Sequence, residues 1–136
     1  MAVIFFVDLS GFNLTLDEAP TYNRMDESLK LFDSICNSMW FKNTYMILFF
    51  NKCDLFKEKL QYIRFGDFVP GYYGDESFES TSSFLKAKFL ALNKLNASKP
   101  IYVHYTCATD TKQMKFVFGT VTDAIIRSSL KASGLL

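Results

Sequence analysis

Three short apolar runs constrain the fold most, because each is rich in β-branched and aromatic residues and has the length of one strand. The runs occupy residues 2–7, 45–50 and 101–105. Unbroken apolar runs of this length are typical of strands that are buried on both faces of a parallel sheet. The first run has the composition of a central strand, so we expect it to need a neighbouring strand on each side.

The segments between and after these runs have helical periodicity instead. Their apolar residues recur at spacings of three and four, which places them on one face of a helix. They are Met25, Leu29, Phe32, Cys36 and Met39, then Leu85, Phe89 and Leu92, and last Met114, Val117, Phe118, Val121 and Ile125, with Gly134 at the helix end. Residues 65–77, rich in glycine and polar residues, predict a surface insertion. The alternation predicts an α/β fold, with an open parallel sheet of three strands and helices on its faces.

The composition indicates one globular domain, because 136 residues with a net charge of +1 and 49% hydrophobic content can bury a substantial core. Lysine and arginine residues are scattered, so we expect no nucleic-acid partner. The three cysteines, Cys36, Cys53 and Cys107, lack the spacing of metal sites or disulfides. We interpret them as reduced, buried, intracellular thiols.

The N-terminal run is too short for a transmembrane segment and lacks the basic flank of a signal peptide. Ala2 stands where N-myristoylation requires glycine, so no lipidation site is expected. His104 lies within the third run without an acidic or thiol partner at ligand or triad spacing. We therefore expect His104 to have a structural role.

Four polar residues, Asn51, Lys52, Cys53 and Asp54, follow the second run directly. They lie at the carboxyl end of a predicted strand, where open α/β sheets bind their ligands. A carboxylate such as Asp54 accepts two N–H bonds, which suits a purine with a keto and an amino group. The Asn51 amide can brace a neighbouring loop, and the Lys52 stem can cover a ring face. Taken alone, the same residues also fit a polar turn that caps the next helix.

A second candidate loop, Thr106, Cys107, Ala108 and Thr109, follows the third run. Its small residues let backbone N–H groups approach a ligand. The two loops together resemble the guanine-recognition motifs of GTPases, and the run Thr-Cys-Ala-Thr-Asp-Thr from Thr106 resembles the alpha subunits of heterotrimeric G proteins. The resemblance covers essentially all of the chain. It includes Asn-Arg-Met-Asp-Glu-Ser from Asn23, Leu-Phe-Asp-Ser-Ile-Cys-Asn from Leu31, Phe-Phe-Asn-Lys-Cys-Asp-Leu-Phe from Phe49 and Lys-Phe-Val-Phe from Lys115.

The resemblance implies a partial Ras-like P-loop GTPase fold, with residues 1–136 as the C-terminal portion of the GTPase domain and GTP or GDP as ligand. It implies that Asp54 binds the guanine N1 and amino hydrogens, that Lys52 lies over the base, and that Asn51 ties the loops together. By the same resemblance, the Ala108 amide meets the guanine oxygen. The residues that would support these loops are Cys53, Thr106, Cys107 and Thr109.

The resemblance also implies protein partners at the cytoplasmic, inner face of the plasma membrane: a G-protein-coupled receptor, G beta-gamma and effectors. The last helix and the tail resemble the segment that alpha subunits insert into an activated receptor. The alternative role for this helix is packing against the sheet. Trp40 and Phe41 are placed like an effector loop, although a Trp beside a Phe also fits a core position. The residues expected to contact the receptor are Leu130, Gly134, Leu135 and Leu136.

The chain departs from the family on the phosphate side. It contains no G-x-x-x-x-G-K-[ST] phosphate loop and lacks the Asp that helps hold Mg²⁺, the water-orienting Gln and the charge-stabilising Arg. Mg²⁺ is thus a cofactor of the family without expected ligands here, and GTP hydrolysis by this chain stays open. The missing segment would precede Ala2 in a truncated product, and a shortened complete protein is the alternative. Two further alternatives are an interaction module that needs no nucleotide and a non-functional truncated product.

Overall fold

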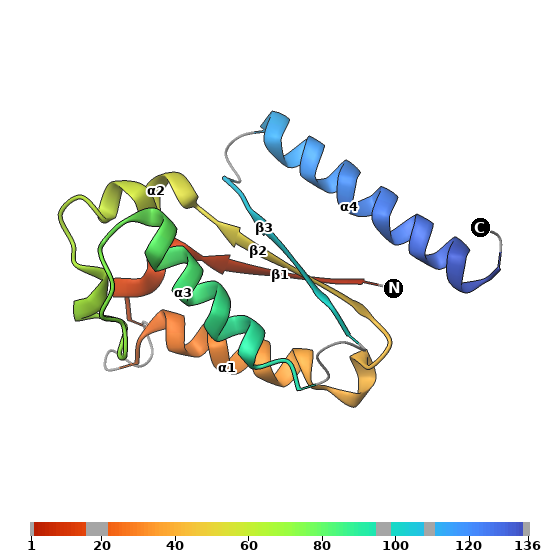
Figure 1. The fold of residues 1–136 in the computed structure, drawn as a ribbon, viewed down its shortest axis with the longest axis horizontal. Helices are drawn as coiled ribbons and strands as arrows, with labels where there is room; N and C mark the ends of the chain where they lie inside the picture. The colour runs from red at the N-terminus through yellow and green to blue at the C-terminus, as the bar shows by residue number, and fades with distance from the viewer. Residues whose placement is uncertain (1, 16–21, 95–98, 108–110, 135–136) are drawn as a thin grey trace.

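The computed structural model describes residues 2–15, 22–94, 99–107 and 111–134. Its centre is a three-stranded sheet in the order β1-β2-β3, in which both pairs of neighbouring strands run parallel (Figure 1). The strands are β1 (Ala2–Asp8), β2 (Tyr45–Asn51) and β3 (Ile101–Tyr105). All three predicted runs are strands, and the predicted α/β fold with an open parallel sheet is confirmed.

Helices lie on both faces of this sheet. α1 and α3 lie side by side on one face, α4 crosses the other, and α2 leads away from the end of β2 (Figure 1). The helices are α1 (Arg24–Cys36), α2 (Cys53–Lys59), α3 (Phe78–Ala91) and α4 (Thr111–Ala132), with short 3-10 helices η1 (Leu9–Asn13), η2 (Met39–Phe41) and η3 (Phe65–Asp67). Among the described residues, no helix is long and apolar enough to cross a membrane.

The larger core lies between the sheet and the pair α1 and α3, and its centre is aromatic. Phe32 of α1 packs edge-on against Phe5 of β1, with ring centroids 5.3 Å apart, and against Phe89 of α3 at 5.5 Å. Phe89 in turn meets Phe50 of β2 at 5.6 Å. Edge-to-face pairs at these distances are favourable beyond the area that they bury. The sheet and both helices therefore share one continuous aromatic core.

The face of α1 was predicted correctly except at Met39. The helix ends at Cys36, and Asn37 caps it, so the chain turns into η2 and leaves Met39 90% exposed. A buried lysine fixes this turn, because the Lys99 Nζ donates to the Cys36 carbonyl at 2.8 Å and to the Phe41 carbonyl at 2.6 Å. The periodic pattern continued past the helix because no glycine or proline marks its end.

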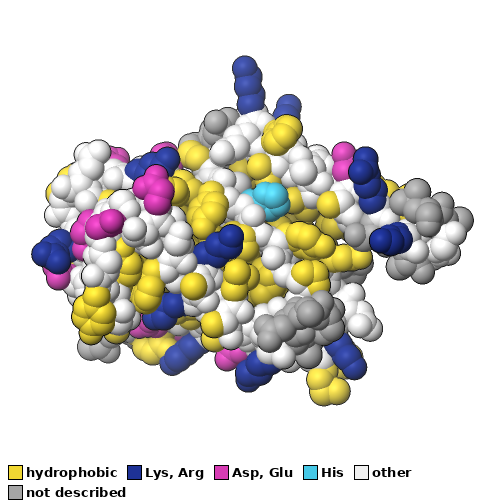
Figure 2. Space-filling view, viewed as in Figure 1, with side chains coloured by type: hydrophobic (Ala, Val, Ile, Leu, Met, Phe, Trp, Pro, Cys, Tyr) yellow, Lys and Arg dark blue, Asp and Glu magenta, His cyan; other side chains and the backbone are white. Residues whose placement is uncertain are grey.

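The face of the sheet beneath α4 is less well covered. Val121 of α4 packs near Phe49 of β2, but Ile4 and Phe6 of β1 remain 39% and 48% exposed. Figure 2 shows hydrophobic side chains at the surface around the single histidine, His104. Within the described part of the chain, β1 pairs only with β2. The prediction that the first run is buried on both faces is wrong at Ile4 and Phe6. β1 lies at the edge of the described sheet and β2 at its centre, so the second neighbour expected from the composition of the first run is not among the described residues.

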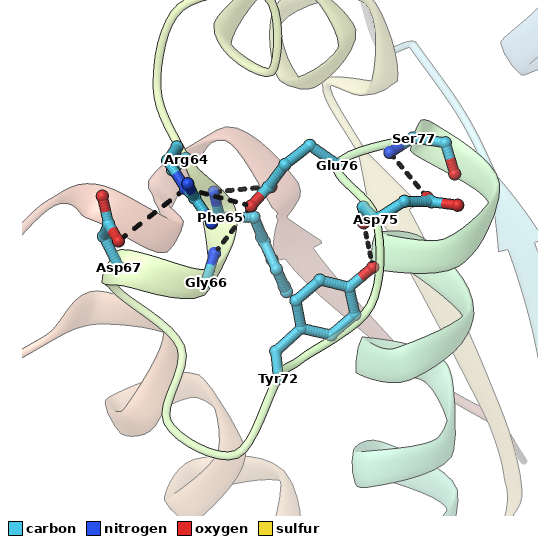
Figure 3. Close-up of polar contacts among 8 residues, drawn as sticks. All are labelled: Arg64, Phe65, Gly66, Asp67, Tyr72, Asp75, Glu76 and Ser77. Atoms are coloured by element: carbon cyan, nitrogen blue, oxygen red, sulfur yellow. Dashed lines mark hydrogen bonds and ion pairs between the residues drawn. The ribbon is translucent and has the colours of Figure 1, made fainter.

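The segment 65–77 between α2 and α3 is more than the predicted surface insertion. The Glu76 carboxylate accepts the N–H groups of Phe65 at 2.8 Å and Gly66 at 3.3 Å, and it lies 3.9 Å from the Arg64 Nε (Figure 3). Glycines correctly predicted turns here, but three apolar side chains of the segment point inward. Those buried in the main core are Phe65, Val69 and Tyr72.

Candidate functional site

The turn predicted to bind guanine links β2 to α2. Lys52 has a φ of 58°, in the left-handed region that few residues other than glycine adopt. This conformation changes the chain direction between Asn51, the last residue of β2, and Cys53, the first of α2. Asp54 consequently lies exposed in the first turn of α2, at the carboxyl edge of the sheet.

Hydrogen bonds join this turn to the second predicted loop. The Thr106 N–H donates to the Phe50 carbonyl at 2.8 Å, and the Cys53 N–H donates to the Thr106 carbonyl at 3.3 Å. The Thr106 hydroxyl donates to the Asn51 side-chain oxygen at 3.2 Å. Thr106 itself is fully buried. The structure thus brings the two loops together and connects the Asn51 side chain to the second one.

The two loops border a pocket of about 340 Å³. A second hollow, of about 180 Å³, lies between α4 and the sheet, but its walls are mostly apolar and contain no predicted guanine-site residue. The larger pocket has a size typical of small-molecule sites, and we place the candidate site there. Its walls come from α2, α3, the end of β3 and the start of α4: Cys53, Asp54, Lys57, Phe78, Tyr105, Thr106, Cys107 and Gln113.

Asp54 supplies negative charge to this pocket. Its pKa is lowered, mainly by a hydrogen bond from the Leu55 N–H and next by one from the Cys107 thiol. An ionised carboxylate accepts two N–H bonds side by side. Nearby, the Lys57 Nζ lies 4.6 Å from the centre of the Phe78 ring. The pocket therefore combines one charged acceptor with aromatic surface, which is what a nucleobase site requires.

The sequence analysis did not identify Asp8, which lies at the same edge of the sheet. The Lys52 Nζ is 3.3 Å from a carboxylate oxygen of Asp8, with side chains 49% and 36% exposed. Asp8 also accepts the Ser10 N–H at 2.9 Å, and the strand register pairs it with Asn51. An acidic residue at the end of the first run was the available signal. Solvent weakens this ion pair, so it orients Lys52 more than it stabilises the fold.

The predicted guanine and receptor residues lie far apart. Leu130 is half-buried near the end of α4, and Gly134 is exposed just beyond it with a φ of 81°. Both lie at the opposite end of α4 from the pocket (Figure 1). Gly134 follows the end of α4, as predicted. Four other predicted site residues fall outside the described residues: Ala108, Thr109, Leu135 and Leu136.

Two single residues can now be placed. His104 faces α4 and contacts the Phe49 ring, with centroids 5.6 Å apart, and burial lowers its pKa. This environment agrees with the predicted structural role. Trp40 is 89% exposed, so the alternative that placed it in the core is wrong.

The prediction of three buried thiols is correct for Cys36 and wrong for the other two. Cys36 is fully buried beneath the sheet, whereas Cys53 and Cys107 are partly exposed and line the pocket. Both follow the carboxyl end of a strand, where side chains leave the core and meet solvent. Burial still raises the pKa of the Cys53 thiol.

A model of the G-protein alpha subunit family matches residues 1–125. The chain belongs to the G-protein alpha subunit family. The match includes all three strands and both loops of the pocket, so the resemblance drawn from the sequence is confirmed. The chain is a guanine-nucleotide-binding alpha subunit, or part of one, of the kind that acts in signal transduction. The family implies GTP or GDP as ligand and G beta-gamma, receptors and effectors as partners.

This alpha-subunit chain has a candidate pocket for the base of GTP or GDP, but its sequence lacks the loop that would bind the phosphates. The pocket offers a charged acceptor, aromatic surface and two loops joined by hydrogen bonds. The sequence contains no phosphate loop. Within the described ranges, no group of three His, Cys, Asp or Glu side chains is placed to hold a metal ion. The Asp54 carboxylate and the aromatic surface of the pocket therefore suit a purine base.

Proposed function

We propose that this alpha-subunit chain binds the guanine base of GDP and GTP in the 340 Å³ pocket between the two loops. The ionised carboxylate of Asp54 at the pocket carries the proposal. It accepts the guanine N1–H and one amino hydrogen, while the Lys52 stem covers a face of the base. Asn51 ties the two loops, and the Ala108 amide donates to the guanine oxygen. Cys53, Thr106, Cys107 and Thr109 support the loops around these contacts.

Asp54 accounts for the choice of base. The guanine edge presents two neighbouring donors, N1–H and the amino group, and a carboxylate accepts both. Adenine presents an unprotonated N1 at the same place, so it leaves the carboxylate facing a lone pair. Sites that match hydrogen bonds in this way reject the mismatched ligand strongly, because a polar group is left unpaired.

The base alone gives weak binding. We propose that residues 1–136 form the C-terminal portion of a Ras-like GTPase domain, which supplies base contacts without the phosphate contacts of the family. Without phosphate contacts, we expect a Kd of roughly millimolar. No hydrolytic step is assigned to these residues.

The partners of the family fit two exposed regions. The receptor is proposed to contact the end of α4 and the tail, where Ile126 is 51% exposed near Leu130. Gly134, Leu135 and Leu136 complete that contact. Effectors are proposed to contact Trp40. This residue lies in η2, and its side chain is exposed to solvent. We propose that these contacts occur at the inner face of the plasma membrane.

A titration followed by NMR tests the base site. We expect guanosine to shift the backbone amide signals of Cys53, Asp54 and Cys107 in a saturable way, and adenosine to leave them unchanged. Asp54→Asn exchanges one acceptor for a donor, so it should lose guanosine binding and favour xanthosine, whose 2-oxo group accepts that donor. Asp67→Asn, on an exposed carboxylate outside the pocket, is the matched control. Equal shifts with guanosine and adenosine would contradict the proposal.

A further inference from the structure

Two of the three thiols lie in one place, although 53 residues separate them in sequence. Cys53 and Cys107 both line the 340 Å³ pocket and both are partly exposed. Cys36 is fully buried in the main core. Solvent therefore reaches one spatial pair of thiols and not the third.

The backbone fixes how far apart this pair is. The Cys53 N–H donates to the Thr106 carbonyl oxygen at 3.3 Å, and that carbonyl carbon is bonded to the Cys107 nitrogen. With standard bond lengths, the two Cα atoms are then about 7 Å apart or closer. Disulfides typically join Cα atoms roughly 4.4 to 6.8 Å apart. A side-chain rotation with a small loop adjustment therefore suffices to bring the sulfur atoms together.

The surroundings of the sulfur atoms agree with this proximity. The Cys53 thiol donates to the Phe50 carbonyl at 3.3 Å, and the Cys107 thiol donates to the Asp54 carboxylate. Burial is the main cause of the raised pKa of the Cys53 thiol. Both thiols thus make their hydrogen bonds at the same edge of the sheet.

We propose that Cys53 and Cys107 form a reversible disulfide when the chain meets a peroxide, and that this bond closes the pocket. The closing effect rests on the proposed function, whereas the disulfide itself does not. The bond would cross the mouth of the pocket between its two loops. It would also remove the thiol that donates to Asp54, the residue proposed to read the base.

The chemistry balances with hydrogen peroxide as the oxidant. One thiolate attacks a peroxide oxygen, the O–O bond breaks, and the leaving hydroxide takes a proton to become water. The second thiol then attacks the resulting sulfenic acid, the S–O bond breaks, and a second water leaves. Two thiols and one hydrogen peroxide give one disulfide and two water molecules. An added dithiol such as dithiothreitol reverses the change by thiol–disulfide exchange.

Peptide mapping of the full chain tests the bond. The chain is treated with hydrogen peroxide, its free thiols are alkylated after unfolding, and its peptides are identified by mass spectrometry. We expect one linked peptide pair containing Cys53 and Cys107, with Cys36 alkylated. Cys53→Ser and Cys107→Ser should each abolish the linked pair, and Cys36→Ser should retain it. Sulfenic acid or intermolecular disulfides at these positions without the linked pair would overturn the proposal.

The guanosine titration then tests the closure. Peroxide treatment should abolish the guanosine shifts of the unsubstituted chain in proportion to the fraction of linked peptide pair, and dithiothreitol should restore them. A linked pair that leaves guanosine binding unchanged would overturn the closure. A reduced chain that does not bind guanosine would instead contradict the proposed function, and the peptide map would still decide on the disulfide.

Discussion

On the face of the sheet covered by α1 and α3, Phe5 and Phe50 are almost fully buried, whereas on the face crossed by α4 Ile4 and Phe6 are 39% and 48% exposed. The first face has a continuous aromatic core, and the second has a hollow of about 180 Å³ beneath α4. Because buried apolar area dominates stability, the α1 and α3 face should hold most of the folding free energy. α4 then rests on a weaker layer.

The largest expected effect is on the well-covered face. Phe32→Ala removes a ring that joins Phe5 to Phe89, so we expect a loss of about 3 to 5 kcal/mol in the free energy of unfolding. Phe118→Ala on α4 is the matched control, because that ring is 38% exposed. It should cost about 1 kcal/mol. Urea unfolding measures both, and equal losses would break the comparison between the faces.

The loop at the end of the well-covered face gives the next effect. Glu76→Ala leaves the partly buried N–H groups of Phe65 and Gly66 without their acceptor, which should cost about 1 to 3 kcal/mol (Figure 3). Asp67→Ala removes only an exposed ion pair with Arg64 and should be nearly neutral. The same urea assay applies. A neutral Glu76→Ala would show that these two hydrogen bonds do not stabilise the loop.

A stabilising change is expected within α4. Gly119 lies inside the helix, and a Cβ there would meet no atom within 4 Å. Gly119→Ala should therefore raise the stability of the helix by about 1 kcal/mol. Gly134→Ala is the contrasting variant, because a φ of 81° strains alanine and should remove any gain. Thermal melting followed by circular dichroism at 222 nm distinguishes them, and a lower melting temperature for Gly119→Ala would contradict the account.

The smallest effect concerns pH and the layer beneath α4. Burial lowers the pKa of His104 below its usual 6.5, so the folded chain binds a proton less readily than the unfolded chain. The contribution of His104 to the free energy of unfolding is constant above pH 6.5. It falls as the pH drops from 6.5 toward the pKa of His104 in the folded chain. His104→Gln should reduce this decline. Urea unfolding between about pH 5 and 8 measures it, and an unchanged slope would exclude His104 as its source.

The sheet could be predicted from the sequence because three apolar runs of strand length stand between helical patterns. The site turn could be predicted because Asn51, Lys52 and Asp54 occupy adjacent positions at a strand end. Asp8 could not be recognised as their neighbour, because its contact with Lys52 depends on which strands pair. Local patterns report the strands, whereas their order is a property of the whole fold.

Burial was the least predictable property. The apolar residues of β1 gave no sign that Ile4 and Phe6 would face solvent, because exposure depends on what α4 covers. Tyr72 lies among turn residues, yet it is buried because the loop folds back onto the core. Cys53 and Cys107 lie beside apolar runs but beyond the strand ends. In each case the partner that decides exposure is remote in sequence.

α4 has a further consequence through its length. Its 22 residues span about 33 Å at 1.5 Å per residue. Near its start, Gln113 accepts the Cys107 N–H at 2.8 Å, and near its end lies Leu130. A tilt of about 5° pivoting at the pocket would displace the far end by about 3 Å. A displacement of a few ångströms at the far end of α4 therefore corresponds to only a small rotation of the helix at the wall of the pocket.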